Sequence, residues 1–309
     1  MRAFRFGVQA AGAPSGGAWR ALARRAEDLG YSTLCMPDHF DDQWSPIVAM
    51  TVAAEATERL VVGALVFNND LRHPLVLARE MATLDLVAEG RVEVGLGAGW
   101  MASDYDAAGV VLDAPAVRVE RLGEAVAVMK RLWSDGSCTF AGEHYQLRAA
   151  GSRPRLPGGR RPALVIGGGG RQVLRLAARE ADVVGVHVDL RSGRFDGAVI
   201  RSALAERYRR RLAWVRESAG DRWDEVELQC LTFVVMVTDS GARIIEQVAP
   251  AFGLTPAEAR EVPNVLVGSV DAIVETVQRR REELGFSYLV VHQGEMEAFA
   301  PVVARLAGT

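Results

Sequence analysis

The sequence has little of several features that mark other classes of protein. Its only cysteines are Cys35, Cys138 and Cys230, and no two of them form a CxxC pair. An odd number of unpaired thiols is typical of a reducing compartment. The first ten residues form no long apolar run, and no segment reaches the roughly 20 apolar residues that a membrane helix needs. We therefore expect a cytoplasmic protein that makes no contact with a membrane.

Lysine is nearly absent, since Lys130 is the only one and all other basic residues are arginines. The formal net charge of the 309 residues is -3 at pH 7. Proteins that bind duplex nucleic acid usually have a high pI and a basic face. The charge balance therefore argues against nucleic acid as a partner, and we expect a small-molecule substrate instead.

Short apolar runs alternate with segments of helical periodicity along the chain. The runs that we expect to be strands are 4–10, 32–38, 59–67, 91–99, 163–167, 181–188, 225–237 and 287–293. Strict alternation of strand and helix predicts a parallel sheet, and eight such units close a barrel. The interval 134–162 interrupts the alternation and is expected to be a loop.

A doubly wound open sheet is the competing architecture, and the first strand–helix junction distinguishes the two. A dinucleotide-binding fold would have GxGxxG there, whereas this chain has QAAGAPSGG at 9–17. The sequence therefore predicts an α/β fold, a (β/α)8 TIM barrel with loop insertions, formed by residues 1–309 as a single domain.

Four consecutive glycines, Gly167, Gly168, Gly169 and Gly170, lie between an apolar strand and an amphipathic helix. Glycine permits close backbone approach and positive φ angles. The free N–H groups of a first helical turn attract anions, and Arg171 adds a positive charge. The junction predicts an anion site, and a tight turn that binds nothing is the alternative.

Polar residues follow most of the expected strands, at the end where the active site of a barrel lies. They are Asp38, His39, Asn68, Asn69, Trp100, Asp104, His187 and His292. One histidine there is usually a loop residue, but three at one rim indicate chemistry. A metal-dependent hydrolase is one interpretation, although such enzymes usually have HxH on the first strand, which FRFGVQA lacks.

Five segments together resemble the bacterial luciferase-like flavin and deazaflavin oxidoreductases. They are DHF (38–40), 72–91, GRVEVGLGAGWMASDYDAAG (90–109), 166–182 and 267–285, and they follow the family's order over nearly the whole chain. The branch that uses coenzyme F420 is the most similar, because an Asp-His pair follows its second strand and a tryptophan comes shortly after. Asp38, His39 and Trp44 match that pattern.

The resemblance implies coenzyme F420 as the cofactor, with FMN as the alternative. It implies that Gly167–Gly170 and Arg171 hold the cofactor phosphate, and that Gly97 and Gly99 let the backbone pass close to the cofactor. It also implies a non-proline cis peptide at Leu65–Val66 against one face of the ring. Asn68 and Asp104 complete the implied cofactor-binding set.

The implied chemistry is hydride exchange between the cofactor and a small organic substrate. His39 is the expected proton donor or acceptor, with Asp38 orienting its ring. In the alternative, Asp38 caps a turn and His39 packs under the cofactor. Trp44, Trp100, His187 and His292 are expected to line the substrate pocket. The family's habit of forming dimers implies a homodimer.

Two features depart from the family pattern or go beyond it. Sugar-phosphate dehydrogenases of this branch have a glutamate directly after GxGxG, where this chain has Trp100. Sugar-phosphate oxidation is therefore not expected, and the pocket should be more apolar. The interval 148–162 holds Arg148, Arg153, Arg155, Arg160 and Arg161 and no acidic residue. A solvated loop is the usual interpretation of such a run, and the hypothesis beside it is that the loop binds the poly-glutamate tail of F420. A luciferase-like monooxygenase and a non-catalytic relative are the other functional alternatives.

Overall fold

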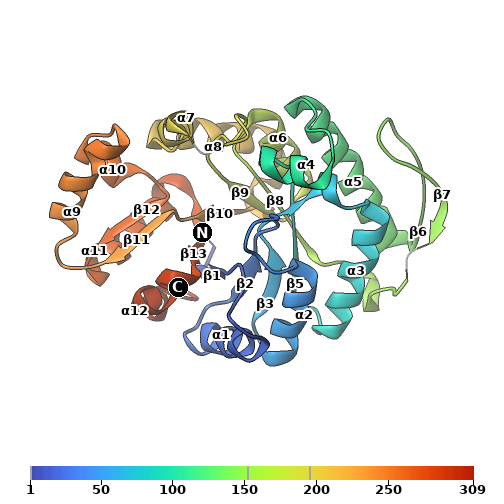
Figure 1. The fold of residues 1–309 in the computed structure, drawn as a ribbon, viewed down its shortest axis with the longest axis horizontal. Coiled ribbons are helices and arrows are strands. Elements are labelled where there is room, and N and C mark those ends of the chain that lie inside the picture. The colour runs from blue at the N-terminus through green and yellow to red at the C-terminus, as the bar shows by residue number, and fades with distance from the viewer. Residues whose placement is uncertain (1, 152, 195) are drawn as a thin grey trace.

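Eight parallel strands form a closed barrel in the computed structural model, which describes residues 2–151, 153–194 and 196–309 (Figure 1). The strands are β1 (Arg5–Gln9), β2 (Thr33–Met36), β3 (Val61–Ala64), β5 (Val92–Gly97), β8 (Ala163–Gly168), β9 (Val183–Val186), β10 (Glu227–Leu231) and β13 (Phe286–His292). They pair in the order β3-β2-β1-β13-β10-β9-β8-β5, and β3 pairs with β5 to close the ring. The expected TIM barrel is confirmed.

The strand sequences are continuous apolar runs because one face of each strand packs in the barrel interior and the other packs against helices. All residues of β2, β5 and β9 are buried between the barrel interior and an outer ring of helices. That ring consists of α1 (Gly16–Asp28), α2 (Pro46–Ala56), α3 (Pro74–Val87), α5 (Pro115–Asp135), α6 (Arg171–Glu180), α8 (Ala205–Ala219), α11 (Val270–Leu284) and α12 (Met296–Leu306). Proline begins α2, α3 and α5, where its missing N–H costs no hydrogen bond.

Several short elements connect these units. They are β4 (Phe67–Asn68), α4 (Ala102–Ala108), α7 (Gly197–Ser202), and the 3-10 turns η1 (Asn69–Leu71), η2 (Pro157–Gly159), η3 (Gly220–Glu225), η4 (Ala249–Phe252) and η5 (Gln293–Glu295). Strand β4 continues the line of β3 and pairs with β5. Helix α4 follows β5 directly, so it lies at the C-terminal end of the barrel.

The expected loop at 134–162 instead contains an antiparallel hairpin of β6 (Ser137–Ala141) and β7 (Gln146–Gly151). Glu124 of α5 fixes its turn, because its carboxylate accepts hydrogen bonds from the backbone N–H groups of Glu143, His144 and Tyr145 at 2.7, 2.9 and 3.0 Å. The prediction was wrong because this stabilising contact comes from a helix some 20 residues away, and local composition does not record it.

The expected single strand 225–237 is two strands. Thr232 directly follows the last residue of β10, and its hydroxyl donates to the Val290 carbonyl at 2.9 Å. The next residues form β11 (Val234–Val237), which pairs with β12 (Val265–Gly268) outside the barrel. Figure 1 shows this pair beside α9 (Gly241–Val248) and α10 (Pro256–Glu261), away from the barrel axis. The apolar run is continuous across the break, so periodicity alone does not reveal it.

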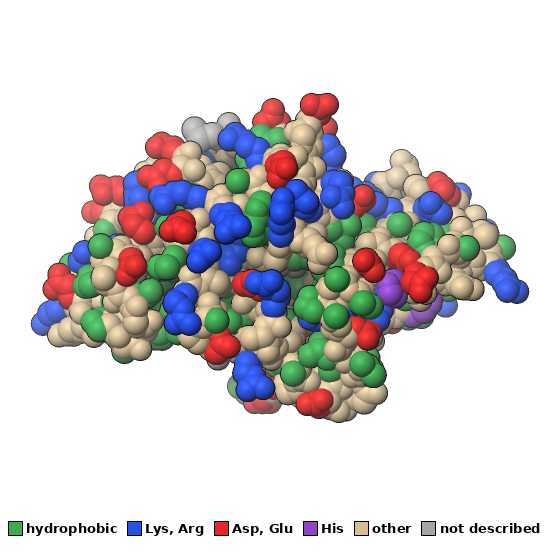
Figure 2. Space-filling model, turned by 90° about the horizontal axis from the view of Figure 1, so that it is seen from above, with side chains coloured by type: hydrophobic (Ala, Val, Ile, Leu, Met, Phe, Trp, Pro, Cys, Tyr) green, Lys and Arg blue, Asp and Glu red, His purple; other side chains and the backbone are tan. Residues whose placement is uncertain are grey.

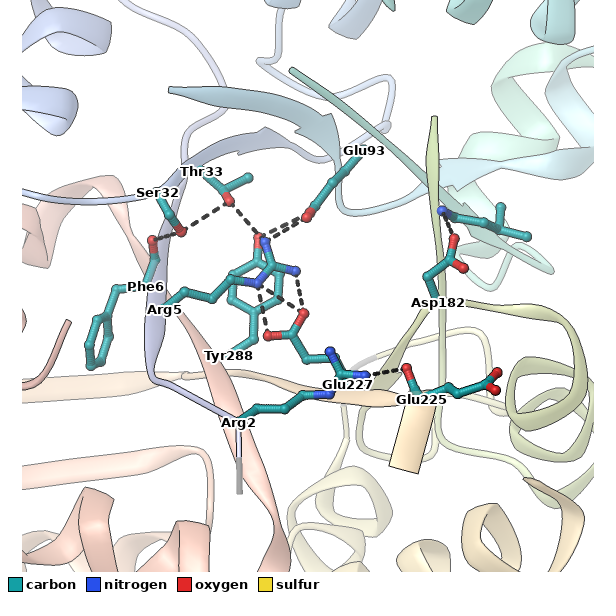
Figure 3. A network of polar contacts seen from close by, with 11 residues as sticks. Arg2, Arg5, Phe6, Ser32, Thr33, Glu93, Asp182, Glu225, Glu227 and Tyr288 are labelled. Carbon is teal, nitrogen blue, oxygen red and sulfur yellow. Dashed lines mark hydrogen bonds and ion pairs between the residues drawn. The ribbon is translucent and has the colours of Figure 1, made fainter. Parts of the chain in front are cut away.

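A charged cluster fills the barrel interior at the N-terminal ends of the strands (Figure 3). Arg5 bonds with Glu227 through Nε at 2.9 Å and Nη2 at 2.7 Å, and it also pairs with Glu93. Its guanidinium lies 3.6 Å from the centre of the Tyr288 ring. Burial raises the pKa of the Glu93 carboxyl although Arg5 opposes the shift. This cluster closes the barrel at the end opposite the expected active site.

The two ends of the chain lie close together, and the surface carries mixed charge. The N–H of Phe4 donates to the Thr309 carbonyl at 3.0 Å, so both ends of the described chain meet. Figure 2 shows basic and acidic side chains interspersed over one face, with hydrophobic side chains between them. Among the helices described, none combines the length and apolar character needed to cross a membrane.

Candidate active site

A cavity of about 670 Å³ lies at the C-terminal end of the barrel, and residues at or just beyond the ends of the barrel strands line it. Its volume falls in the range of about 300–1,000 Å³ that is typical of ligand sites. The predicted site residues that line it are Asp38, His39, Leu65, Val66, Asn68, Gly97, Gly99, Trp100, Asp104, Gly167–Gly170, Arg171, His187 and His292. Residues far apart in the sequence therefore meet in one cavity.

Trp44 is the exception, because it is not among the cavity-lining residues. Its ring centre lies 5.7 Å from that of Trp19 on α1. The backbone N–H of Trp44 donates to the Ala11 carbonyl at 2.9 Å. The expectation that Trp44 lines the substrate pocket stays a prediction.

His39 is oriented by Asp104. Its Nδ1 atom lies 2.7 Å from Oδ2 of Asp104, whose other oxygen accepts from the Phe40 N–H at 3.2 Å. A carboxylate only accepts hydrogen bonds, so Nδ1 carries the proton and Nε2 is the atom left to exchange one. The indole of Trp100 packs edge-on against the imidazole, with ring centres 5.7 Å apart and planes at 84°.

Asp38 does not orient His39, which corrects the sequence-based expectation. Its carboxylate bonds with the guanidinium of Arg72 through both oxygens, with Nη2 to Oδ1 at 2.9 Å, and accepts from the Asn68 N–H at 3.0 Å. Asp38 therefore ties the end of β2 to β4 and to the connection before α3. Arg72 supplied no local signal, because it lies 34 residues away along the chain.

The peptide bond between Leu65 and Val66 is cis, as the resemblance implied. Gln9, which the sequence did not single out, donates from Nε2 to the Leu65 carbonyl at 2.8 Å. The Val66 side chain then lies over two glycines. A Cβ atom would fall 2.6 Å from Val66 Cγ2 at Gly97 and 3.2 Å from Val66 Cγ1 at Gly167. Glycine is needed at Gly97 because the bulge occupies the space of a side chain.

The glycine run ends in the uncapped N-terminus of α6. Gly170 is the N-cap residue and has no side chain to accept from the first-turn N–H groups. A Cβ at Gly169 would collide with the Val188 carbonyl, so this backbone passes directly against the segment that follows β9. Arg211, which the sequence did not single out either, is buried and donates from Nε to the Gly169 carbonyl at 3.0 Å. The glycine loop is thus fixed in position and closely packed, and the first-turn N–H groups of α6 are suited to bind a phosphate.

Two further histidines line the cavity. Burial lowers the pKa of His187 to about 4, so its imidazole is neutral at physiological pH. Its ring packs edge-on against Phe233 at 5.2 Å. His292 ends β13. Within the described residues no group of three or more His, Cys, Asp or Glu side chains could hold a metal ion. The hydrolase interpretation therefore lacks a ligand set there.

Arg160 and Arg161 lie at the opposite end of the barrel from the cavity. Arg160 pairs with Asp85 at 2.8 Å, and Arg161 bonds with both oxygens of Asp182 at 2.6 and 2.7 Å. Both precede β8, whose six residues span about 20 Å before the glycine run begins. The positive charges of Arg160 and Arg161 are thus paired at the N-terminal end of the barrel, and the hypothesis that the loop binds a cofactor tail stays a prediction.

The barrel, the glycine run before α6 and the bulge after β3 can be compared with known proteins. Residues 3–288 match the model of the luciferase-like monooxygenase family. The chain belongs to this family.

Among characterised relatives, the chain is 34% identical over 172 residues to an F420-dependent glucose-6-phosphate dehydrogenase from Kineococcus radiotolerans, covering 52% of this chain and 49% of that protein. It is also 34% identical over 172 residues to the enzyme of the same name from Mycolicibacterium fortuitum, covering 52% and 50%. The chain thus spans about half the length of the curated relatives it matches.

Solved structures share the fold. The F420-dependent tetrahydromethanopterin reductase from Methanopyrus kandleri superposes with a TM-score of 0.78 at 19% identity, covering 99% of this chain and 100% of that one. An F420-dependent secondary alcohol dehydrogenase gives 0.72 at 20% identity, with coverage of 98% and 97%. The long-chain alkane monooxygenase LadA gives 0.77 at 14% identity, with coverage of 99% and 91%.

Proposed function

We propose that the chain is an F420-dependent oxidoreductase that transfers a hydride between C5 of the deazaflavin and a small organic substrate. The observation that carries the proposal is one cavity with three parts: a phosphate cradle at Gly167–Gly170, the Val66 bulge and the His39–Asp104 pair. The F420-dependent relatives support the choice of cofactor.

The residues present fit such a cofactor. The first turn of α6 and the Gly167–Gly170 backbone would hold its phosphate, because their donors have no side-chain cap. Val66 would support one face of its ring system, since the glycines beneath leave the valine exposed to the cavity. When bound, the deazaflavin supplies hydride donation and acceptance, and the protein contributes position and proton transfer.

In this proposal His39 moves the proton. Nδ1 is committed to Asp104, so Nε2 accepts a proton from a substrate hydroxyl or donates one to a forming oxyanion. Asp104 acts through the imidazole and is a positioning residue, because its contact with Nδ1 fixes the orientation and the tautomer of the ring. His187 is too acidic when protonated to replace it near neutral pH.

An FMN-dependent monooxygenase is the second candidate, because the matching family model is that of luciferase-like monooxygenases and the cradle suits any flavin phosphate. Fluorescence titration with F420 and FMN side by side separates the two. We expect micromolar binding of F420 and at least tenfold weaker binding of FMN. Preferential micromolar binding of FMN would contradict the proposal in favour of the monooxygenase.

We further propose a cytoplasmic homodimer that uses the outer face of α2 and α3. Helix α2 has a single charged residue, Glu55, and a helix that is apolar all round is normally covered. Val48 on α2 and Val76 on α3 are nevertheless 66% and 52% exposed. Analytical ultracentrifugation should find a dimer that Val48→Glu dissociates. A monomeric wild-type protein at assay concentration would refute this part.

A further inference from the structure

On the substrate side of the cavity this chain has the indole of Trp100. A glutamate at that position would offer a second group for proton transfer, and the indole does not. Trp100 follows Gly99 and packs edge-on against His39, so it borders the atom that exchanges the proton. Apolar side chains continue the wall beyond it. They are Pro115, Val119, Leu190, Leu231 and Phe233.

Two of the three arginines that line the cavity donate hydrogen bonds to other groups of the protein. Arg118 is buried and donates from Nε to the Asp113 carbonyl at 2.9 Å and from Nη1 to the carbonyls of Ala98, at 3.4 Å, and Gly99. Arg191 bonds with both oxygens of Asp189 at 3.0 and 2.9 Å. Arg171 begins α6 at the glycine run, where the proposed function puts the cofactor phosphate. An anionic substrate beside Trp100 would therefore compete with the protein for Arg118 and Arg191, and with the cofactor phosphate for Arg171.

The only lysine lies elsewhere. Lys130 of α5 pairs with Glu180 of α6 at 2.8 Å, in the outer ring of helices. The chain around the cavity also exposes apolar side chains. Phe40, next to His39, is 57% exposed, and Val111, in the connection from α4 to the cavity residue Pro115, is 73% exposed. An aqueous anion would lose hydration against these apolar side chains, whereas an apolar body would bury surface on both sides.

We infer that the substrate is an uncharged molecule with an apolar body, and that Trp100 is the residue that determines this specificity. The inference rests on the proposed function and narrows it to a substrate whose apolar body lies between Trp100 and the apolar wall. A sugar phosphate, the substrate in the names of the curated relatives, should bind weakly, because the apolar wall would remove water from its phosphate.

Calorimetric titration with the linear methyl ketones from butan-2-one to octan-2-one tests the inference, with glucose 6-phosphate and 4-oxopentanoate as anionic probes. The titrations use the protein with and without F420. We expect the Kd to fall about threefold for each added methylene until the wall is filled. Both anions should bind at least tenfold more weakly than hexan-2-one. A Kd independent of chain length, or an anion that binds as tightly as the ketones, would overturn the inference.

Variants locate the effect. Trp100→Ala should weaken binding of octan-2-one at least tenfold and leave the Kd for F420 within about twofold, and Trp100→Phe should keep most of the affinity. Phe252→Ala is the control, because Phe252 is a half-exposed aromatic residue on η4 that does not line the cavity. This variant should change neither the Kd for octan-2-one nor the Kd for F420. If Trp100→Ala and the wild type bind the ketones with equal Kd, Trp100 does not determine the specificity. Failure of F420 to bind while the chain-length trend persists would refute the cofactor proposal and leave the substrate class standing.

Discussion

His39 Nδ1 and Asp104 Oδ2 lie 2.7 Å apart, although 65 residues separate them in the chain. Asp38, the neighbour of His39 in sequence, instead forms an ion pair with Arg72. The two carboxylates therefore have different duties. Asp104 orients the imidazole, and Asp38 connects the end of β2 to β4 and to the segment before α3. Substitution of each should separate these duties experimentally.

Asp104→Asn should impair the chemical step. The amide can donate to Nδ1 as well as accept from it, so it no longer fixes the tautomer of His39, and kcat should fall about 10- to 100-fold, below the full loss expected without an acid–base group. A kcat equal to that of the wild type would show that Asp104 does not position the imidazole for the chemical step.

Asp38→Asn should act on stability instead. It leaves the Arg72 guanidinium without its carboxylate and weakens the bond to the Asn68 N–H. We expect a loss of about 2 kcal/mol in the free energy of unfolding, measured by urea denaturation, since Arg72 keeps some contact with water. The kcat–pH profile should keep its midpoint. A shifted midpoint would mean that Asp38 does influence the imidazole.

Gly97→Ala should weaken cofactor binding. Its Cβ would fall 2.6 Å from Val66 Cγ2, so the bulge must shift at the point where it supports the ring. Overpacking of this kind typically costs about 1–3 kcal/mol, or roughly five- to 150-fold in the Kd for F420 if the strain appears only in the bound form. Gly294→Ala is the matched control, because nothing lies within 4 Å of the added carbon. Equal affinities for the two variants would refute the role of the bulge.

Arg5→Met should destabilise the barrel floor. Glu93 and Glu227 would lose their shared cation, and breaking a buried pair typically costs about 3–5 kcal/mol. The folded-state pKa of Glu93 is raised, so its contribution to stability is present at low pH and is lost as pH rises through that pKa. Removing Arg5 raises it further, so the penalty in denaturant titrations should be larger at pH 8 than at pH 5. A pH-independent penalty would contradict this account of the cluster.

Sequence reasoning reached the parts of the fold that local patterns encode. Eight apolar runs with helical segments between them specify the barrel, and the rim residues follow from where the strands end. The glycine run and the Leu65–Val66 peptide were placed through motifs and the family resemblance.

Pairing between distant residues could not be read in the same way. The partners of His39 and Asp38 depend on how α4 and the β4–α3 connection fold over the rim. The contact between Trp44 and Trp19 could not be predicted, because spacing gives a position along the chain and not the direction of a ring. The acidic partners of Arg160 and Arg161 could not be predicted either, because Asp85 and Asp182 lie outside the run of charge.

The most direct test of the central claim compares kcat and F420 affinity in His39→Ala. With octan-2-one and reduced F420 as probes, kcat should fall by about 10²–10⁴-fold while the Kd for F420 changes only several-fold, and the ionisation in the kcat–pH profile should disappear. A variant that keeps its turnover but no longer binds F420 would contradict the account, because His39 would then hold the cofactor and the proton would come from another group.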